Sequence, residues 1–135
     1  MNDKIDQALG TQSAALAMRV KRQQLIATNI ANADTPGYKA VDIDFRRAMK
    51  GAVEQTQAAA NAAAAPAGGM QKSAFAGLDT RIPTFTRVPA QTAADANTVD
   101  MDVERARFAE NAVRYEAALK FLNGQIKTLL SAIQG

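Results

Sequence analysis

The 135-residue sequence contains no cysteine and no histidine. Without cysteine, the chain forms no disulfide and offers no thiolate to a metal ion. Without histidine, it lacks the commonest general base and the commonest metal ligand. Hydroxyl side chains therefore have no evident base to activate them, and no glycine-rich phosphate-binding loop is present. We predict that the protein is not an enzyme, uses no cofactor, and has no catalytic, cofactor-binding or metal site.

Large apolar side chains are also scarce. Aromatic residues make up 5% of the chain, and much of the 47% hydrophobic fraction is alanine, which buries little area. No apolar run approaches the roughly 20 residues that span a membrane, and the first ten residues lack the pattern of a cleaved signal peptide. The net charge of +3 is too small for the basic stripe of a nucleic-acid-binding protein. We therefore expect a thin monomer core, no membrane span and no nucleic-acid partner.

Residues 1–33 are predicted to form an N-terminal coiled-coil helix. Their pattern repeats at alternating steps of four and three residues, which defines one helical stripe. Such a helix is marginal alone, because amphipathic helices owe most of their stability to packing. Polar residues interrupt the stripe at Gln12, Arg19 and Gln23, and its apolar members are Ile5, Leu9, Leu16, Ile26 and Ile30.

Residues 98–135 are predicted to form a second coiled-coil helix with a cleaner stripe. The heptad spacing continues without a polar break, which is typical of a helix that pairs with other helices. Asn97 and Thr98 are candidate caps for its start, and we interpret the charged residues along it as a solvated face. The predicted seam consists of Phe108, Ala112, Tyr115, Leu119, Leu122, Ile126, Leu129 and Ile133.

The middle of the chain is predicted to be a connecting segment, 34–57, followed by a partly disordered Ala/Pro/Gly-containing segment, 58–97. Residues 41–45 alternate apolar and polar side chains as a strand does, and we interpret Asp42 and Asp44 as its solvated face. A short helix is expected to begin in "FRRAMKGAVEQ". Pro83 and Pro89 restrict "TRIPTFTRVPA" to an extended or edge strand.

Together these patterns predict a mainly α fold. The N- and C-terminal helices pair as a coiled coil, and the middle is extended and partly disordered with short β segments. Because both seams need partners, we expect copies of the chain to pair through them as well.

The stretch "NIANADTPGYKA" ends the first helix. Thr35-Pro36-Gly37-Tyr38 fits a type II turn, with proline at the second place and glycine at the third, where φ must be positive. Asn29 and Asn32 lie one helical turn apart, and asparagine can end a helix or bond nearby backbone groups. On local physics alone, the stretch is fully explained as a helix terminator.

The same stretch, read as "LIATNIANADTPGYKA", resembles the signature of the flagellar basal-body rod and hook family. The resemblance covers Asn29, Asn32, Thr35, Pro36, Gly37 and Tyr38, and the segment 97–133 is similar to the end of a short proximal-rod member. It implies a structural protein of the proximal rod whose paired terminal helices stack into a tube. That tube surrounds the export channel and transmits torque.

The resemblance also implies partners and a location. The partners would be copies of the chain, other rod proteins, the rod-base adaptor at the membrane ring and export gate, and the flagellar type III export apparatus. The protein would lie in the periplasmic part of the basal body, exported without a cleaved signal peptide. Phe45 and Met49 fit the family's short export-gate motif, although an ordinary amphipathic turn explains them equally well.

Two hypotheses complete this interpretation. We expect Tyr38 to pack across a subunit boundary, since it offers both an apolar ring and a hydroxyl just after the turn. The alternative function is that of an intracellular coiled-coil adaptor or export chaperone.

Overall fold

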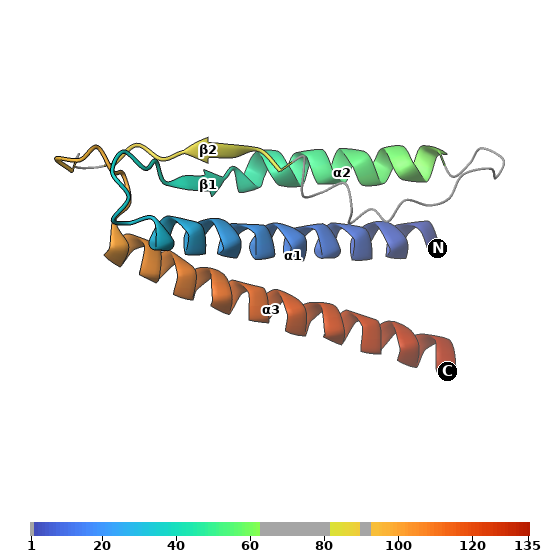
Figure 1. Ribbon diagram of the computed structural model, residues 1–135. Helices are drawn as coiled ribbons and strands as arrows, with labels where there is room; N and C mark the ends of the chain where they lie inside the picture. Colours follow the sequence, from blue (N-terminus) through green and yellow to red (C-terminus); the bar gives the residue numbers. More distant parts are fainter. Residues whose placement is uncertain (1, 63–81, 90–92) are drawn as a thin grey trace.

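The computed structural model describes residues 2–62, 82–89 and 93–135. Its elements are α1 (Asn2–Ala31), β1 (Val41–Ile43), α2 (Phe45–Ala62), β2 (Thr84–Thr86) and α3 (Met101–Gln134). Helix α1 lies between two layers: α3 packs antiparallel to it on one side, and α2 with the two strands packs on the other (Figure 1). The predicted fold class is confirmed, because two long terminal helices pair and the middle contributes a short sheet. The disorder predicted within 58–97 falls partly on 63–81 and 90–92, which lie outside the described residues.

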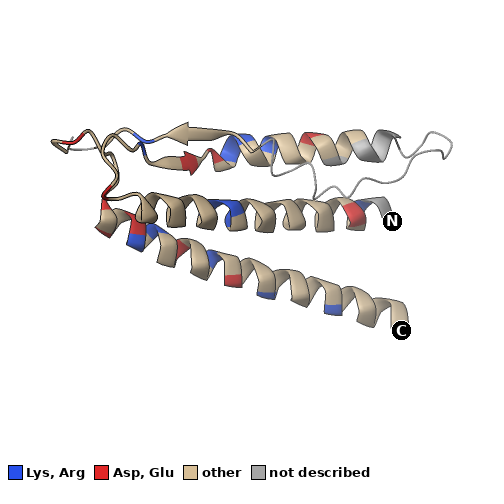
Figure 2. Ribbon diagram, viewed as in Figure 1, with Lys and Arg blue, Asp and Glu red and all other residues tan. Residues whose placement is uncertain are grey.

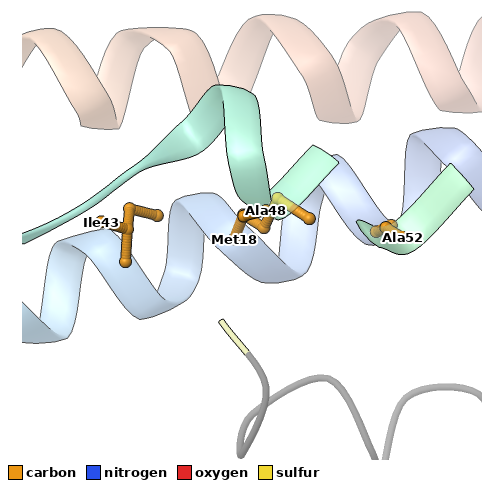
Figure 3. Close-up of a cluster of buried hydrophobic side chains, with 5 residues drawn as sticks. Met18, Ile43, Ala48 and Ala52 are labelled. Carbon is orange, nitrogen blue, oxygen red and sulfur yellow. The ribbon is translucent and has the colours of Figure 1, made fainter. Parts of the chain in front are cut away.

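A small apolar core joins α1 to α2. Met18 of α1 is fully buried, and Ile43, Ala48 and Ala52 pack around it (Figure 3). Ala48 and Ala52 are four residues apart, so they lie on one face of α2 and let its backbone approach α1 closely. Helix α2 runs to Ala62 and is longer than the short helix predicted, because its alanines favour helix and some of them are buried.

The two strands form an antiparallel pair in which Asp42 lies opposite Phe85. This confirms the extended conformation predicted around Pro83 and Pro89. The first strand ends earlier than the alternation indicated, since Phe45 already belongs to α2. Asp44 begins that helix: its Oδ1 accepts a hydrogen bond from the Arg47 N–H at 3.1 Å.

Helix α3 faces α1 with a stripe that is rotated from the predicted seam. Tyr115, Leu122 and Leu129 are half-buried, whereas Leu119 and Ile126 keep 38% and 39% of their surface exposed. The remaining predicted members divide the same way: Ala112 is half-buried, Phe108 is 39% exposed and Ile133 is 81% exposed. The positions fully buried on α3 are instead Glu104 and Asn111. The rotation follows from these two polar side chains, which find hydrogen-bond partners on the facing elements.

Asp100 caps the start of α3, which corrects the prediction of Asn97 or Thr98. The Asp100 carboxylate accepts hydrogen bonds from the Asp102 and Val103 N–H groups at 3.1 and 3.2 Å. Asn97 and Thr98 instead bind the chain that follows α1. The Thr98 hydroxyl oxygen accepts a bond from the Ala40 N–H at 2.8 Å.

Candidate functional site

A cluster of buried polar side chains lies where the end of α1, the turn after it, both strands and the start of α3 meet. Four of its members are at most 4% exposed, and all of them come from segments far apart in the sequence. Buried polar groups cost stability unless they are hydrogen-bonded, so each one requires a partner. We call Asn29, Asp42, Arg87, Asn97 and Glu104 the polar junction; Arg87 is included because its 12%-exposed side chain joins the two acids.

Asn29 uses its full hydrogen-bonding capacity within the chain. Its Nδ2 donates to the Val41 carbonyl at 2.9 Å and to Glu104 Oε2 at 3.2 Å. Its Oδ1 accepts from the Val41 N–H at 3.0 Å and from the Tyr38 hydroxyl at 3.2 Å. Two donors and two acceptor positions are all that an asparagine side chain has. Asn29 therefore does more than end a helix, because it ties α1 to β1 and to α3.

The predicted type II turn is present. Gly37 has a φ of +72°, and the Tyr38 N–H donates to the Thr35 carbonyl at 3.2 Å. Asn32 acts locally: its Nδ2 donates to the Thr28 carbonyl at 2.8 Å and its Oδ1 accepts from the Thr35 hydroxyl at 3.1 Å. Pro36 is exposed at the tip of the turn. The signature thus combines a local turn with Asn29, whose side chain makes long-range contacts to β1 and α3.

Asn97 holds the turn from the other side. Its Nδ2 lies within 2.8–3.0 Å of three carbonyl oxygens, those of Asn32, Ala33 and Thr35. The Gly37 N–H also donates to the Asp95 carbonyl at 2.8 Å. The segment before α3 therefore satisfies carbonyls that the end of α1 leaves open. Sequence reasoning placed Asn97 as a cap and missed this role.

Asp42 is the centre of an ion-pair network and not part of a solvated face, so that prediction was wrong. Its Oδ1 lies 3.0 Å from Arg22 Nε, and its Oδ2 lies 2.8 Å from Arg87 Nη2. Arg87 also forms an ion pair with Glu104, which is 1% exposed. The interpretation of the α3 charges as solvated fails for Glu104 for the same reason. Asp44, by contrast, is exposed as expected.

A second polar contact joins the two long helices one to two turns further along. Asn111 Nδ2 donates to the Arg19 carbonyl at 2.9 Å and to Gln23 Oε1 at 2.6 Å. Arg19 and Gln23 are two of the polar residues that interrupted the predicted stripe of α1. The guanidinium of Arg19 lies 5.1 Å from the ring centre of Phe45, a cation–π distance. Two of the three interruptions therefore contact other helices. Gln23 and the Arg19 carbonyl bind α3, and the Arg19 guanidinium contacts α2.

The remaining predicted residues occupy ordinary packing positions. Phe45 and Met49 are half-buried against the core between α1 and α2. On α1, Ile26 is fully buried, and Ile5, Leu9, Leu16 and Ile30 are half-buried. Charged residues of both signs are spread along α3 (Figure 2). Within the described ranges there is no group of three side chains suited to hold a metal ion, and no helix long and apolar enough to cross a membrane.

Comparison with known proteins gives a consistent result. Residues 9–39 match the family described as "Flagella basal body rod protein". The chain is 42% identical to the flagellar basal body rod protein FlgB of Escherichia coli over 135 residues, and 39% identical to FlgB of Proteus mirabilis over 142 residues. Each alignment covers 99% of this chain and 98% of the relative. FlgB of Cereibacter sphaeroides is 41% identical, with 94% of both chains covered.

The chain belongs to the FlgB family of flagellar basal body rod proteins. It is a structural component of the flagellar basal body rod, as the resemblance of the signature implied. The matched residues 9–39 end one residue after the Thr35–Tyr38 turn, so the family match and the turn coincide.

The Tyr38 hydroxyl has a hydrogen-bond partner within its own chain, the Oδ1 of Asn29. Tyr38→Phe removes only the hydroxyl. A hydrogen bond between uncharged groups makes a net contribution of about 0.5–1.5 kcal/mol to stability. We expect a loss of this size in the free energy of unfolding, measured with urea, and unchanged rod assembly. If Tyr38→Ala unfolds no more readily than Tyr38→Phe and yet stops assembly, the ring contacts another subunit. If both variants assemble normally, the hypothesis of a subunit contact is wrong.

The network around Asp42 should also make the stability of the folded chain depend on pH. Burial alone would raise the pKa of Asp42, but the hydrogen bonds from Arg22 and the Ile43 N–H, together with the charges of Arg22 and Arg87, hold it below its ordinary value. The unfolded chain, with a pKa of about 3.9 at this residue, therefore binds the proton first. The stabilisation is complete well above pH 4 and is lost as the pH falls through the lower, folded-state pKa.

The measurement is a series of urea titrations between pH 7 and pH 3. Wild type should lose stability steadily below about pH 4.5. Asp42→Asn should be less stable at pH 7 and should show a shallower decline. Parallel declines for the two proteins would mean that Asp42 does not contribute to the acid sensitivity.

Proposed function

We propose that this chain assembles through α1 and α3 into the proximal rod, as part of the tubular shaft that surrounds the export channel and transmits torque. The observation that supports this is the incomplete burial of α3 in a single chain. Much of its apolar surface remains exposed, far more than the isolated apolar residues that a monomer surface normally shows. The exposed large apolar residues of α3 are Val103, Phe108, Val113, Leu119, Phe121, Ile126, Leu130 and Ile133.

The same proposal assigns partners to the protein and a role to each segment of the chain. Copies of the chain and other rod proteins would cover the terminal helices, 1–33 and 98–135. The rod-base adaptor and the type III export apparatus would be further partners, with Phe45 and Met49 in the export-gate motif. The segments 34–57 and 58–97 would connect the helices without chemistry of their own, so the protein would not be an enzyme. We set aside the adaptor or chaperone function, because the relatives described above are rod proteins.

The test is complementation of a deletion strain with a matched pair of variants. Wild type should restore rods in isolated basal bodies and swimming. Leu122→Asp should fail, since it places a charge on the half-buried face of α3, a cost of several kcal/mol when the charge is unpaired. Lys127→Asp, at an exposed position of the same helix, should restore swimming. Normal rods in the deletion strain would refute the proposed function.

A further inference from the structure

The C-terminal half of α3 carries an apolar ridge on one flank. We define the ridge as Leu119, Ile126, Leu130 and Ile133, whose side chains are 38%, 39%, 51% and 81% exposed. Leu119, Ile126 and Ile133 follow one another at seven-residue intervals, so they form a straight line along the helix. In the single chain the ridge packs only partly against α1, and it offers a regular surface to another helix pair.

A groove lies between the same half of α3 and the first turns of α1. Its volume is about 700 Å³, and it is open to solvent. Apolar side chains of both helices line it, and two lysines and several small or polar residues complete the lining. The apolar members are Ile5, Ala8, Leu9, Phe121 and Leu129; the others include Lys4, Lys120, Gly124 and Gln125.

The ridge and the groove lie on opposite flanks of α3 at the same height. Leu119 and Phe121 are two residues apart, which corresponds to about 200° around a helix. The same offset separates Ile126 on the ridge from Thr128 in the groove. A copy that docks its ridge in the groove of a neighbour therefore keeps its own groove open to a further copy.

The groove lies near the two chain ends, away from the polar contacts that Glu104 and Asn111 make with α1. Glu104 and Asn111, in the first third of α3, form side-chain hydrogen bonds that join α3 to α1. Helix α3 diverges from α1 toward the two chain ends (Figure 1). A third helix can therefore enter between them without displacing a buried polar contact.

We infer that the ridge of one copy of the chain fills the groove of the next copy. The charges agree with this pairing, because Lys4 and Lys120 line the groove and Glu116 precedes the ridge by one turn. Each copy presents a ridge on one side and a groove on the other, so the contact is head-to-tail and repeats from copy to copy. Such contacts produce a ring or a helical array. The inference rests on the proposed function, since it names the partner that covers α3.

The absence of cysteine from the chain gives a direct test. Two differently tagged copies are produced together in the deletion strain, one carrying Ala8→Cys in the groove and the other Ile126→Cys on the ridge. Basal bodies are isolated, oxidised and separated on non-reducing gels. A disulfide requires Cα atoms roughly 4.4–6.8 Å apart, so only docked copies can form it. Leu119→Cys and Ile133→Cys cover a shift by one heptad.

Lys127→Cys paired with Ala8→Cys is the matched control, because residue 127 follows Ile126 but projects about 100° away from it. We expect a mixed-tag dimer with at least one ridge position at several times the yield of the control. No excess with all three ridge positions, in basal bodies from swimming cells, would overturn the ridge-and-groove contact and leave the proposed function intact. Loss of rods in a strain that carries only one cysteine would instead show that the altered position itself is needed for assembly. The inference requires this of the ridge positions, because they form the contact between copies.

Discussion

Arg87→Met is expected to lower the free energy of unfolding by about 3–5 kcal/mol. Arg87 donates to both Asp42 and Glu104, which are 4% and 1% exposed. Methionine fills most of the volume, but it leaves the Glu104 carboxylate hydrogen-bonded to the neutral Asn29 amide in place of a guanidinium. A buried carboxylate without a compensating charge is among the most costly changes that a single substitution can make. Urea unfolding followed by far-UV circular dichroism measures the loss.

Arg114→Met is the matched control, because it removes the same charge from an exposed ion pair. Arg114 Nη2 lies 2.6 Å from Glu110 Oε1, with the two side chains 58% and 51% exposed. Such i,i+4 pairs contribute about 0.3–0.5 kcal/mol, so we expect a change of that size. Similar losses for the two variants would show that the polar junction is not buried in solution.

A third variant tests how much net stability the buried Arg87–Glu104 ion pair contributes after the free energy of desolvation is counted. Buried ion pairs often contribute little net stability, since desolvation offsets much of the attraction. Arg87→Met combined with Glu104→Leu should therefore recover much of the stability lost by Arg87→Met alone. No recovery would mean that Arg87 stabilises the fold mainly through Asp42.

The sequence predicted the elements whose causes are local. The four-and-three spacing located both long helices, and proline and glycine located the turn at Thr35–Tyr38 and the extended segment around β2. Each of these signals depends on residues a few positions apart, so one sequence is sufficient to find them.

The polar junction could not be predicted in the same way, because its contacts connect distant positions. Asn29 and Glu104 are separated by 75 residues, and Arg87 reaches Asp42 across 45. A charged residue in a helical pattern is usually solvent-exposed, which is why Glu104 was interpreted as surface. One clue was present: the polar Gln23 interrupts the α1 stripe, and its side chain is the one that Asn111 binds.

The rotation of α3 away from the predicted seam also results from contacts between residues that are far apart in the sequence. The apolar residues of α3 form a band wider than one helix contact can cover, so hydrophobic spacing alone does not decide which edge faces α1. Hydrogen bonds to Glu104 and Asn111 decide it, and the other edge of the band stays exposed. Polar groups at the interface of a helix pair commonly fix its register in this manner.

Asn29→Asp should have the largest effect of any change within the family signature, a loss of about 2–4 kcal/mol in the free energy of unfolding. The substitution keeps the shape of the side chain and replaces its two N–H donors by an oxygen. The Val41 carbonyl then loses a hydrogen bond, and a second carboxylate faces Glu104 Oε2, 3.2 Å from the position of the lost donor. Two carboxylates at this separation repel each other strongly in a buried site.

Asn32→Ala is the control that gives this result its meaning. Asn32 is the other asparagine of the signature, but its hydrogen bonds are exposed and local, to the Thr28 carbonyl and the Thr35 hydroxyl. We expect a loss of about 0.5–1.5 kcal/mol. If the signature served only to end a helix, the two substitutions would cost similar amounts, since both residues lie in the last turn of α1 or just after it. A much larger loss for Asn29→Asp would show that the signature fastens α1 to β1 and α3, and that this junction sets the position from which α3 extends toward its neighbours.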